Sequence, residues 1–278
     1  MVLFFSKRLS VLLATLVLVL AFSPRTSAQS FAITHAKVNL VAESNSLQAG
    51  KTAWMGVLFD LEKGWHIYWE NPGDSGEPPK VQWQLPAGFH AGEVRWPTPA
   101  RLSTGTVIDY GYEGRVLLPV PVQVPADYTP GKPVMVSAYI RYLICREVCI
   151  PAKAQAKLSI PSANASSDAT NRELFRSTLD SVPKAWPSGW KAQVSDSAGF
   201  FLLSLETGAS EAKAAFFPLE EDQIDNPAAQ GVMPTPRGVQ IKLKKSDQLS
   251  KPISTLKGVV VLGSGRAYSI TAPVAGKK

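Results

Sequence analysis

Residues 134–160 read VMVSAYIRYLICREVCIPAKAQAKLSI, and this stretch sets the fold of the part of the chain around it. Apolar residues alternate with mostly polar ones on both sides of the two cysteines: Val134, Val136, Ala138 and Ile140 come before them, and Ala154, Ala156, Leu158 and Ile160 come after. A period of two residues is typical of β-strands that bury one face. The stretch therefore predicts two β-strands joined through the segment that holds the cysteines.

Cys145 and Cys149 are the two cysteines of the chain and lie four residues apart. On an extended strand such residues are separated by about 13 Å, which is four steps of ~3.3 Å. A disulfide instead needs Cβ atoms about 3.5–4.5 Å apart. If the pair forms a bridge, the first strand must end near Ile144 and residues 146–148 must turn. Cys149 then lies beyond a tight loop, in a small and exposed ring.

The pair has more than one possible role. As a structural staple, a ring of about five residues adds only about 2 kcal/mol, against ~4.7 kcal/mol for a 100-residue loop. A sandwich of this size does not need a staple to fold. As a redox centre, the pair needs an accessible sulfur and a thiolate. Arg146 would favour that thiolate and Glu147 would oppose it.

A metal site is a further alternative. Two thiolates suit the soft ion Cu(I). Zinc normally takes four ligands, and the remaining nitrogen donors, all distant from the cysteines in sequence, are His35, His66 and His90. The sequence shows no Gly-rich phosphate loop and no Gly-x-Ser-x-Gly motif. We therefore expect no cofactor and no resident metal, with Cu(I) binding as an alternative.

The amino-terminal segment has the pattern of an export signal. Lys7 and Arg8 precede an uncharged apolar run over residues 9–22, and small residues follow as far as Ala28. The run is short against the ~20 residues that span a bilayer. We therefore expect residues 1–28 to be a signal peptide cleaved after Ala28. The mature chain is then expected to be soluble and outside the cytoplasm, where disulfides persist.

Charge gives no support to nucleic-acid binding. The chain has 29 Lys and Arg against 22 Asp and Glu, a formal net charge of +7. Three of the cations lie in the expected signal segment, which has no acids, so 26 cations and 22 acids leave a net +4 in the mature chain. Its cations come at most in pairs such as Lys244-Lys245, not in basic runs. No later segment is apolar and long enough to span a bilayer, so we expect no membrane insertion after cleavage.

Further short runs predict an all-β, antiparallel β-sandwich over residues 29–161. Residues 52–59 are apolar enough for a strand buried on both faces, and residues 65–70 and 81–85 alternate. Residues 116–124 are apolar but hold Pro119 and Pro121, which suits an edge strand. Turn-forming residues separate these runs, as in the stretch 71–76.

The character of the sequence changes after Ile160. Residues 161–168 are small and polar, and the sequence Thr170-Asn-Arg-Glu173 matches a capping box ahead of a short helix that ends before Pro183. We expect a linker and short helix over residues 162–184. A second, smaller β domain is expected over residues 185–278, with strands near 199–205, 212–217, 239–243, 258–262 and 267–271.

Four blocks, taken together and in order, resemble one known family. They are GWHIYWENPGDSG at residues 64–76, RWPTP at 95–99, YGYEGR at 110–115 and CREVCIP at 145–151. This combination is similar to the periplasmic amino-terminal region of the thiol:disulfide interchange protein DsbD, and its nearest branch is the copper-sensitivity-suppressor (ScsB-like) one. Residues 215–218, followed by an acidic stretch, resemble that branch's second β region. The resemblance covers most of residues 31–270.

The resemblance implies an immunoglobulin-like sandwich with a redox-active cysteine pair, onto which Cys145 and Cys149 fall as the catalytic residues. In the family, this periplasmic region takes electrons from a membrane domain and passes them to thiol proteins. The sequence ends at Lys278 without that membrane domain or the family's thioredoxin-like domain. We therefore expect a separate membrane electron transporter and periplasmic thioredoxin-like proteins as partners. The resemblance also favours Cys149 as the residue that forms the mixed disulfide.

Other family positions are expected to be structural. The Trp-rich block 64–76 should form core strands and a tight turn, and Tyr110 and Tyr112 should pack near the pair without a catalytic role. In the enterobacterial branch a loop with an aromatic residue shields the cysteines, and the matching residues 103–106 hold no aromatic. The alternative from another class of protein is a non-enzymatic β-sandwich binding module with a structural disulfide.

Overall fold

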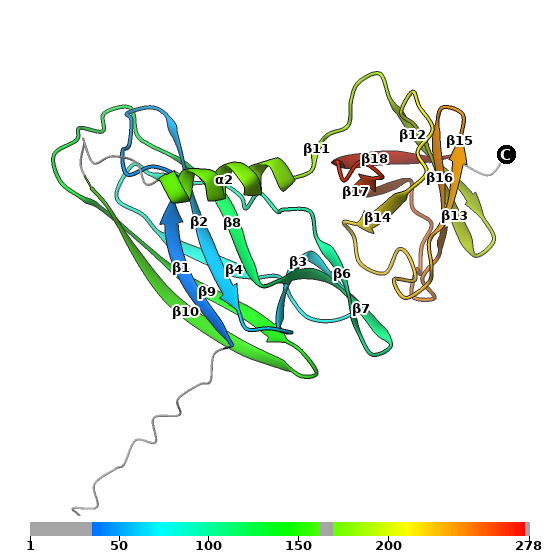
Figure 1. Cartoon of the computed structure of the whole chain (residues 1–278), viewed down its shortest axis with the longest axis horizontal. Helices are drawn as coiled ribbons and strands as arrows, with labels where there is room; N and C mark the ends of the chain where they lie inside the picture. Colours follow the sequence, from blue (N-terminus) through cyan, green and yellow to red (C-terminus); the bar gives the residue numbers. More distant parts are fainter. Residues whose placement is uncertain (1–34, 162–168, 276–278) are drawn as a thin grey trace, which may run out of the picture. The chain divides into compact units, whose positions relative to one another are not determined.

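The computed structural model describes residues 35–161 and 169–275 (Figure 1). The expected signal peptide and most of the expected linker lie outside these residues. Residues 34–278 form one compact unit by their contacts, so the domain boundary expected between 161 and 185 stays a prediction. Among the described residues, no helix has both the length and the apolar character needed to cross a membrane.

One antiparallel sheet has the strand order β1-β2-β8-β5. Its central pairing joins β2 to β8 over nine residue pairs, from Thr52↔Gln123 to Asp60↔Arg115. The strands are β1 (Ala36–Ala42), β2 (Thr52–Leu61), β5 (His90–Ala91) and β8 (Arg115–Gln123).

A second antiparallel sheet has the order β10-β9-β3-β7-β6, with β4 paired to β9. Its longest pairing is the hairpin of β9 and β10, which run side by side in Figure 1. The strands are β3 (His66–Gly73), β4 (Lys80–Gln84), β6 (Ala100–Thr104), β7 (Val107–Glu113), β9 (Val134–Cys145) and β10 (Cys149–Ile160).

These two sheets share one hydrophobic core. The core takes Met55, Val57 and Phe59 from β2, and Val136 and Ile140 from β9, all at most 1% exposed. Alternate residues of each strand point inward because successive side chains of a strand lie on opposite faces. The arrangement confirms the expected all-β, immunoglobulin-like sandwich.

Strand β2 is buried on both faces, as its sequence predicts. Its second face is covered by helix α2 (Ala169–Ser181), whose Phe175 is fully buried against Leu58 and Leu117 (Figure 1). The helix begins one residue before Thr170, at Ala169, and ends two residues before Pro183. The predicted short helix is therefore present, and it seals the outer face of the four-stranded sheet.

Strand β8 differs from the expected edge strand in one respect. It is not the outermost strand of its sheet, because the two residues of β5 pair with its end at Val122 and Gln123. Along the rest of this side, the carbonyls of Pro119 and Pro121 accept hydrogen bonds from the backbone N–H groups of Arg95 and Gly92. Proline has no N–H to donate, so this side of β8 makes only isolated hydrogen bonds to the loop after β5, in place of a continuous series of strand-to-strand hydrogen bonds.

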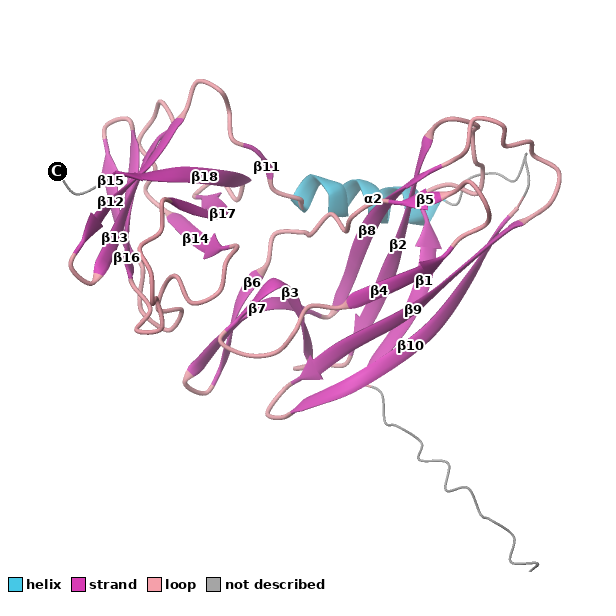
Figure 2. Cartoon of the chain, turned by 180° about the vertical axis from the view of Figure 1, so that it is seen from behind, coloured by secondary structure: helices cyan, strands magenta, loops and turns pink. Residues whose placement is uncertain are grey.

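A third sheet of eight strands follows helix α2 and has its own hydrophobic core (Figure 2). Five of its strands match the predicted runs. The sequence patterns missed the short β11, the mainly polar β12 and the five-residue β15. The strands are β11 (Lys184–Ala185), β12 (Lys191–Ser197), β13 (Phe200–Glu206), β14 (Ala214–Pro218), β15 (Gly231–Thr235), β16 (Gly238–Lys244), β17 (Thr255–Leu262) and β18 (Ala267–Ala275).

The packing of α2 predicts a large effect for Phe175→Ala. Truncating a fully buried aromatic side chain leaves a cavity and costs about 3–5 kcal/mol of the free energy of unfolding. Arg176→Ala is the matched control, because Arg176 is exposed and pairs only with exposed acids of the same helix; we expect it to change stability by less than about 0.5 kcal/mol. Urea unfolding measures both, and equal effects would contradict the packing role of α2.

Candidate redox site

The β9–β10 hairpin brings the two cysteines together. Cys145 is the last residue of β9 and Cys149 the first of β10, and they are direct partners in the strand register. They form a disulfide with an S–S distance of 2.05 Å. The connecting loop holds Arg146, Glu147 and Val148. The turn expected at residues 146–148 is therefore present, and the pair closes the end of the hairpin.

The two sulfurs lie in different environments. Cys145 is 2% exposed, because it pairs on its other side with His66 of β3. Cys149 begins the edge strand and is exposed. An attacking thiolate needs an accessible sulfur. The geometry therefore opens Cys149 to a partner and keeps Cys145 covered.

Tyr68 of β3 lies against both sulfurs. Its hydroxyl donates a hydrogen bond to Cys145 Sγ at 2.8 Å and lies 3.2 Å from Cys149 Sγ. Burial raises the pKa of Tyr68, and the charge of Asp109 adds to the rise, while a hydrogen bond with Ser75 partly offsets it. The phenol is therefore protonated at neutral pH and available as a donor to sulfur.

Buried polar groups continue from Tyr68 into the protein. The Ser75 hydroxyl lies 3.5 Å from the Tyr68 hydroxyl and donates to Asp109 Oδ1 at 2.8 Å. The other carboxylate oxygen, Oδ2, is 3.4 Å from His66 Nε2. Asp109 is 1% exposed and His66 is 3% exposed. Asp109 and His66 thus lie behind Tyr68, and His66 Nε2 makes no hydrogen bond in the described structure.

The turn after β3 holds Tyr68 in place. Gly73 and Gly76 have φ angles of 90° and 85°, a backbone region that favours glycine. A Cβ atom at Gly76 would overlap the Tyr68 ring, so the turn passes directly over that ring. The Trp-rich block forms a core strand and tight turn as expected. The block also supplies Tyr68, whose hydroxyl contacts both sulfurs.

The alternation predicted for residues 65–70 is not seen in their burial. Residues 65–69 are all buried, and only Glu70 is exposed. Trp65, Ile67 and Trp69 enter the sandwich core. His66 and Tyr68 lie on the other face, where the disulfide and the following turn cover them. An alternation of polar and apolar residues in the sequence does not show that the polar face of a strand is itself buried by other parts of the chain.

Arg146 and Glu147 occupy the loop between the cysteines. The Arg146 guanidinium carbon lies 5.4 Å from the centre of the Trp65 ring, a cation–π contact. Arg146 Nε lies 4.0 Å from a Glu147 carboxylate oxygen. Within the described part of the chain, no hydrogen bond joins either side chain to a sulfur. The hydrogen-bond contacts to the sulfurs come from Tyr68.

Tyr110 and Tyr112 make no hydrogen bond to either sulfur in the described structure. The Tyr112 hydroxyl donates to the Pro97 carbonyl at 2.7 Å, and the Tyr110 ring packs edge-on against Trp69. Residues 103 and 104 end β6, and residues 105 and 106 join it to β7, where a Cβ atom at Gly105 would meet no atom within 4 Å. Cys149 remains exposed.

The histidines do not gather around the cysteines as a metal site. His35 stacks on Trp65 and bonds to Glu62, while His90 belongs to the short β5. Across residues 35–161 and 169–275, no three His, Cys, Asp or Glu side chains form a group that could hold a metal.

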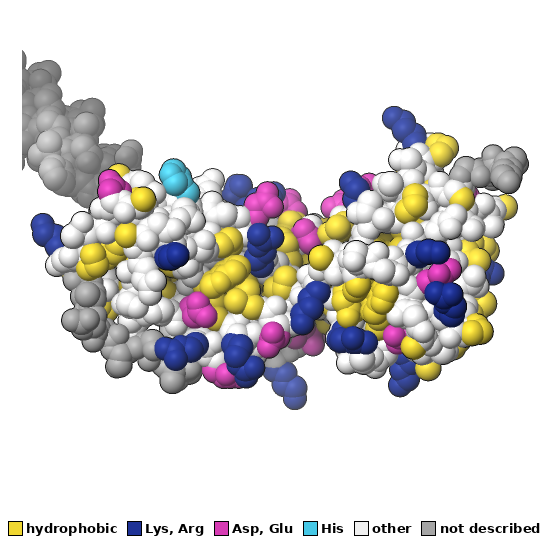
Figure 3. Space-filling view, turned by 90° about the horizontal axis from the view of Figure 1, so that it is seen from above, with side chains coloured by type: hydrophobic (Ala, Val, Ile, Leu, Met, Phe, Trp, Pro, Cys, Tyr) yellow, Lys and Arg dark blue, Asp and Glu magenta, His cyan; other side chains and the backbone are white. Residues whose placement is uncertain are grey.

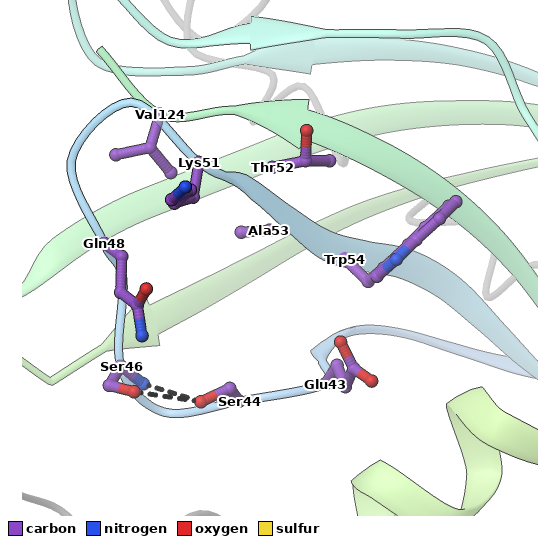
Figure 4. A pocket seen from close by; sticks show the side chains of 9 residues that line it. All are labelled: Glu43, Ser44, Ser46, Gln48, Lys51, Thr52, Ala53, Trp54 and Val124. Carbon is purple, nitrogen blue, oxygen red and sulfur yellow. Dashed lines mark hydrogen bonds between the residues drawn. The ribbon is translucent and has the colours of Figure 1, made fainter. Parts of the chain in front are cut away.

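Hollows elsewhere offer no comparable chemistry. One of about 210 Å³ lies beside the loop that joins β1 to β2, and Figure 4 shows Glu43, Lys51 and Trp54 in its wall. Its Ser44 and Ser46 side chains are hydrogen-bonded to each other. On the face drawn in Figure 3, cationic and anionic side chains are interspersed, so that face holds no extended basic area.

The fold and the site define an immunoglobulin-like domain with an asymmetric, partly exposed disulfide at the end of a hairpin. Residues 37–161 match the family model of the thiol:disulfide interchange protein DsbD, N-terminal. This segment of the chain is therefore a DsbD/ScsB-like amino-terminal domain.

Among solved structures, the N-terminal periplasmic domain of ScsB from Proteus mirabilis is similar in fold. It has a TM-score of 0.64 and 16% sequence identity, and the match covers 87% of this chain and 94% of that chain. The periplasmic chaperone SfaE has a TM-score of 0.22 and 7% identity, with 85% of this chain and 100% of that chain covered. A search of curated proteins finds no match.

The Tyr68 contact predicts slower reduction of the disulfide in Tyr68→Phe. A hydrogen bond to a charged group is worth about 1.5–3 kcal/mol, and 1.36 kcal/mol corresponds to a factor of ten. Loss of the donor to Cys145 should slow reduction by dithiothreitol about tenfold or more. Tyr142→Phe is the control, because Tyr142 lies on the same strand β9 with no hydrogen bond to either sulfur in the described structure. Equal rates in the two variants would rule out the donor role.

Proposed function

We propose that this protein is an exported thiol–disulfide relay that exchanges electrons with thioredoxin-like partners through Cys145 and Cys149. The observation that supports this most directly is the asymmetry of the disulfide. One sulfur is open to a partner, and the other is covered and hydrogen-bonded to Tyr68. A staple that only holds a hairpin closed needs neither feature.

The exchange follows from the two environments. A partner thiolate attacks Cys149 Sγ, the S–S bond breaks, and its electron pair goes to Cys145 Sγ as a thiolate. The partner's second thiolate then attacks the partner sulfur of the mixed disulfide and releases the Cys149 thiolate. The partner leaves as a disulfide, and this protein has gained two electrons and takes up two protons. The reverse sequence begins with the Cys149 thiolate, and Cys145 resolves the mixed disulfide.

Tyr68 has a specific role in this sequence. Its hydroxyl already donates to Cys145 Sγ in the oxidised state, so it is in place when negative charge develops on that sulfur. Asp109 and Ser75 bond to neither sulfur in the described structure: the Ser75 hydroxyl donates its proton to Asp109 and lies 3.5 Å from the Tyr68 hydroxyl.

Family membership of residues 37–161 supports disulfide exchange as the reaction. The ScsB domain of similar fold is periplasmic, which supports a periplasmic location here. A membrane electron transporter is the proposed source of electrons, and thioredoxin-like thiol proteins are the proposed recipients.

A structural disulfide is the alternative, and the reduction potential separates the two functions. Structural disulfides typically lie below about −300 mV. We expect a potential above that limit, measured by equilibration with glutathione and dithiothreitol buffers followed by thiol alkylation. The double variant Cys145→Ser, Cys149→Ser should lose about 2 kcal/mol or less, because the ring is small and the hairpin ladder remains. A potential well below the limit, with a large loss of stability, would establish the staple.

The two single variants test the order of attack. Cys145→Ser retains the exposed thiol and lacks the resolving one, so it should accumulate a mixed disulfide with an oxidised thioredoxin-like protein. Cys149→Ser retains only the covered thiol and should accumulate none. Non-reducing gels and mass spectrometry detect the adduct. Accumulation in Cys149→Ser alone would reverse the assignment, and no adduct in either variant would count against the relay.

A further inference from the structure

The disulfide lies at one end of an open sheet face. Strands β4, β9 and β10 run side by side (Figure 2), and directly paired residues point to the same face of the sheet. The pair Leu143↔Pro151 lies two residues along the ladder from the Cys145↔Cys149 pair, and the pair Arg141↔Lys153 lies two residues further along. The exposed sulfur and these side chains therefore share one surface.

A row of three cations crosses this surface. Lys80 of β4 pairs with Arg141 of β9, which pairs with Lys153 of β10, and all three are exposed. Like charges directly opposite on neighbouring strands are destabilising. These three residues, called here the basic row, therefore lower the stability of the domain when no partner is bound.

One carboxylate offsets part of this charge. Glu77 lies 2.8 Å from Lys80 Nζ, and the hydrogen bond and charge of Lys80, followed by the charge of Arg141, lower the pKa of Glu77. In the described part of the chain, no acid lies within ion-pair distance of Arg141 or Lys153. Three cations against one carboxylate leave the basic row with an excess of two positive charges.

The space between the basic row and the disulfide is hollow. A depression of about 420 Å³ is lined by the three cations together with Glu77, Leu143 and Pro151. The row lies four residue steps along the strand from the cysteine pair, a distance of about 13 Å at ~3.3 Å per step. Along this surface, the exposed sulfur of Cys149 comes first, the apolar pair Leu143 and Pro151 comes next, and the basic row comes last.

Protection of a sheet edge explains only part of this pattern. β10 is the edge strand, and proline and lysine on an edge discourage pairing with other chains. Arg141 belongs to β9, which pairs with both β10 and β4, so it protects no edge. Edge protection therefore does not explain why three cations align in one register. A negatively charged partner that binds there would explain it.

We propose that the basic row and the hollow beside it dock an acidic segment of the partner thiol protein, with the partner's cysteine at Cys149 and its carboxylates on Arg141 and Lys153. This rests on the proposed function and adds to it the charge of the partner. A polypeptide fits the span of about 13 Å, because its cysteine and its carboxylates can lie several residues apart. The contact steers the partner and holds its cysteine beside the exposed sulfur.

Two synthetic thiol peptides test the proposal on the full mature chain. They are identical except for two residues, three and four positions from the single cysteine, which are glutamate in one and glutamine in the other. At low ionic strength, we expect the glutamate peptide to open the disulfide about tenfold faster than the glutamine peptide, since complementary charge raises association rates by 10-fold or more. The advantage should vanish near 1 M salt, where the screening length is about 3 Å.

The double variant Arg141→Gln, Lys153→Gln should lose this preference and keep the wild-type rate with the glutamine peptide. Lys157→Gln is the matched control, an exposed lysine of the same face of β10, four residues beyond Lys153. Equal rates for both peptides on the wild type, or a preference that survives in the double variant, would overturn the proposal. If the rate at which glutathione opens the disulfide falls in the double variant as much as the rate of the glutamate peptide does, a small anionic thiol replaces the polypeptide as the partner, and the proposal is overturned.

Failure of the relay itself has a separate readout. If neither peptide opens the disulfide, the proposed function fails. The docking surface is then judged by binding of the glutamate peptide with serine in place of cysteine. Binding to the wild type that is lost in the double variant would sustain the surface, and no binding to the wild type would overturn it.

Discussion

The register of β9 against β10 is the constraint on which the rest of the molecule depends. It pairs Val134 with Ile160 at one end and Cys145 with Cys149 at the other. A slip of one residue would turn every side chain of a strand to the opposite face. Val136 and Ile140 would leave the core, and Cys145 would no longer lie opposite Cys149. One alignment therefore fixes both the burial of the sandwich and the position of the disulfide.

Much of this could be predicted from local sequence. The period-two pattern of residues 134–160, together with the short distance that a disulfide requires, predicts two strands, a turn at 146–148 and an exposed ring. Phe175 was placed on a helix by turn and capping signals. Strand β12 escaped prediction because its apolar residues are few, and β15 because its five residues include a glycine and a proline; their pairing comes from β13, β16 and β18.

The polar half of the site could not be predicted in this way. Tyr68 and Asp109 are 41 residues apart and meet only because β3 and β7 are neighbours in one sheet. In sequence, His66 and Tyr68 occupy positions that normally face solvent. The turn at 71–76 and the end of the β9–β10 hairpin bury them, and Cys145 of that hairpin lies 77 residues after Tyr68. The one local signal was the glycine at 76, which leaves room for an aromatic ring beneath the turn.

The disulfide closes the end of a ladder that is complete without it. Twelve residue pairs hold β9 to β10, and the S–S bond links only the last of them. Opening that bond therefore leaves the shape of the domain almost unchanged, so a partner meets nearly the same surface in both oxidation states. In the proposed relay, the domain would therefore store electrons without a change of shape that reveals them to a partner. The direction of transfer is then set by the chemical potential of the pools on either side.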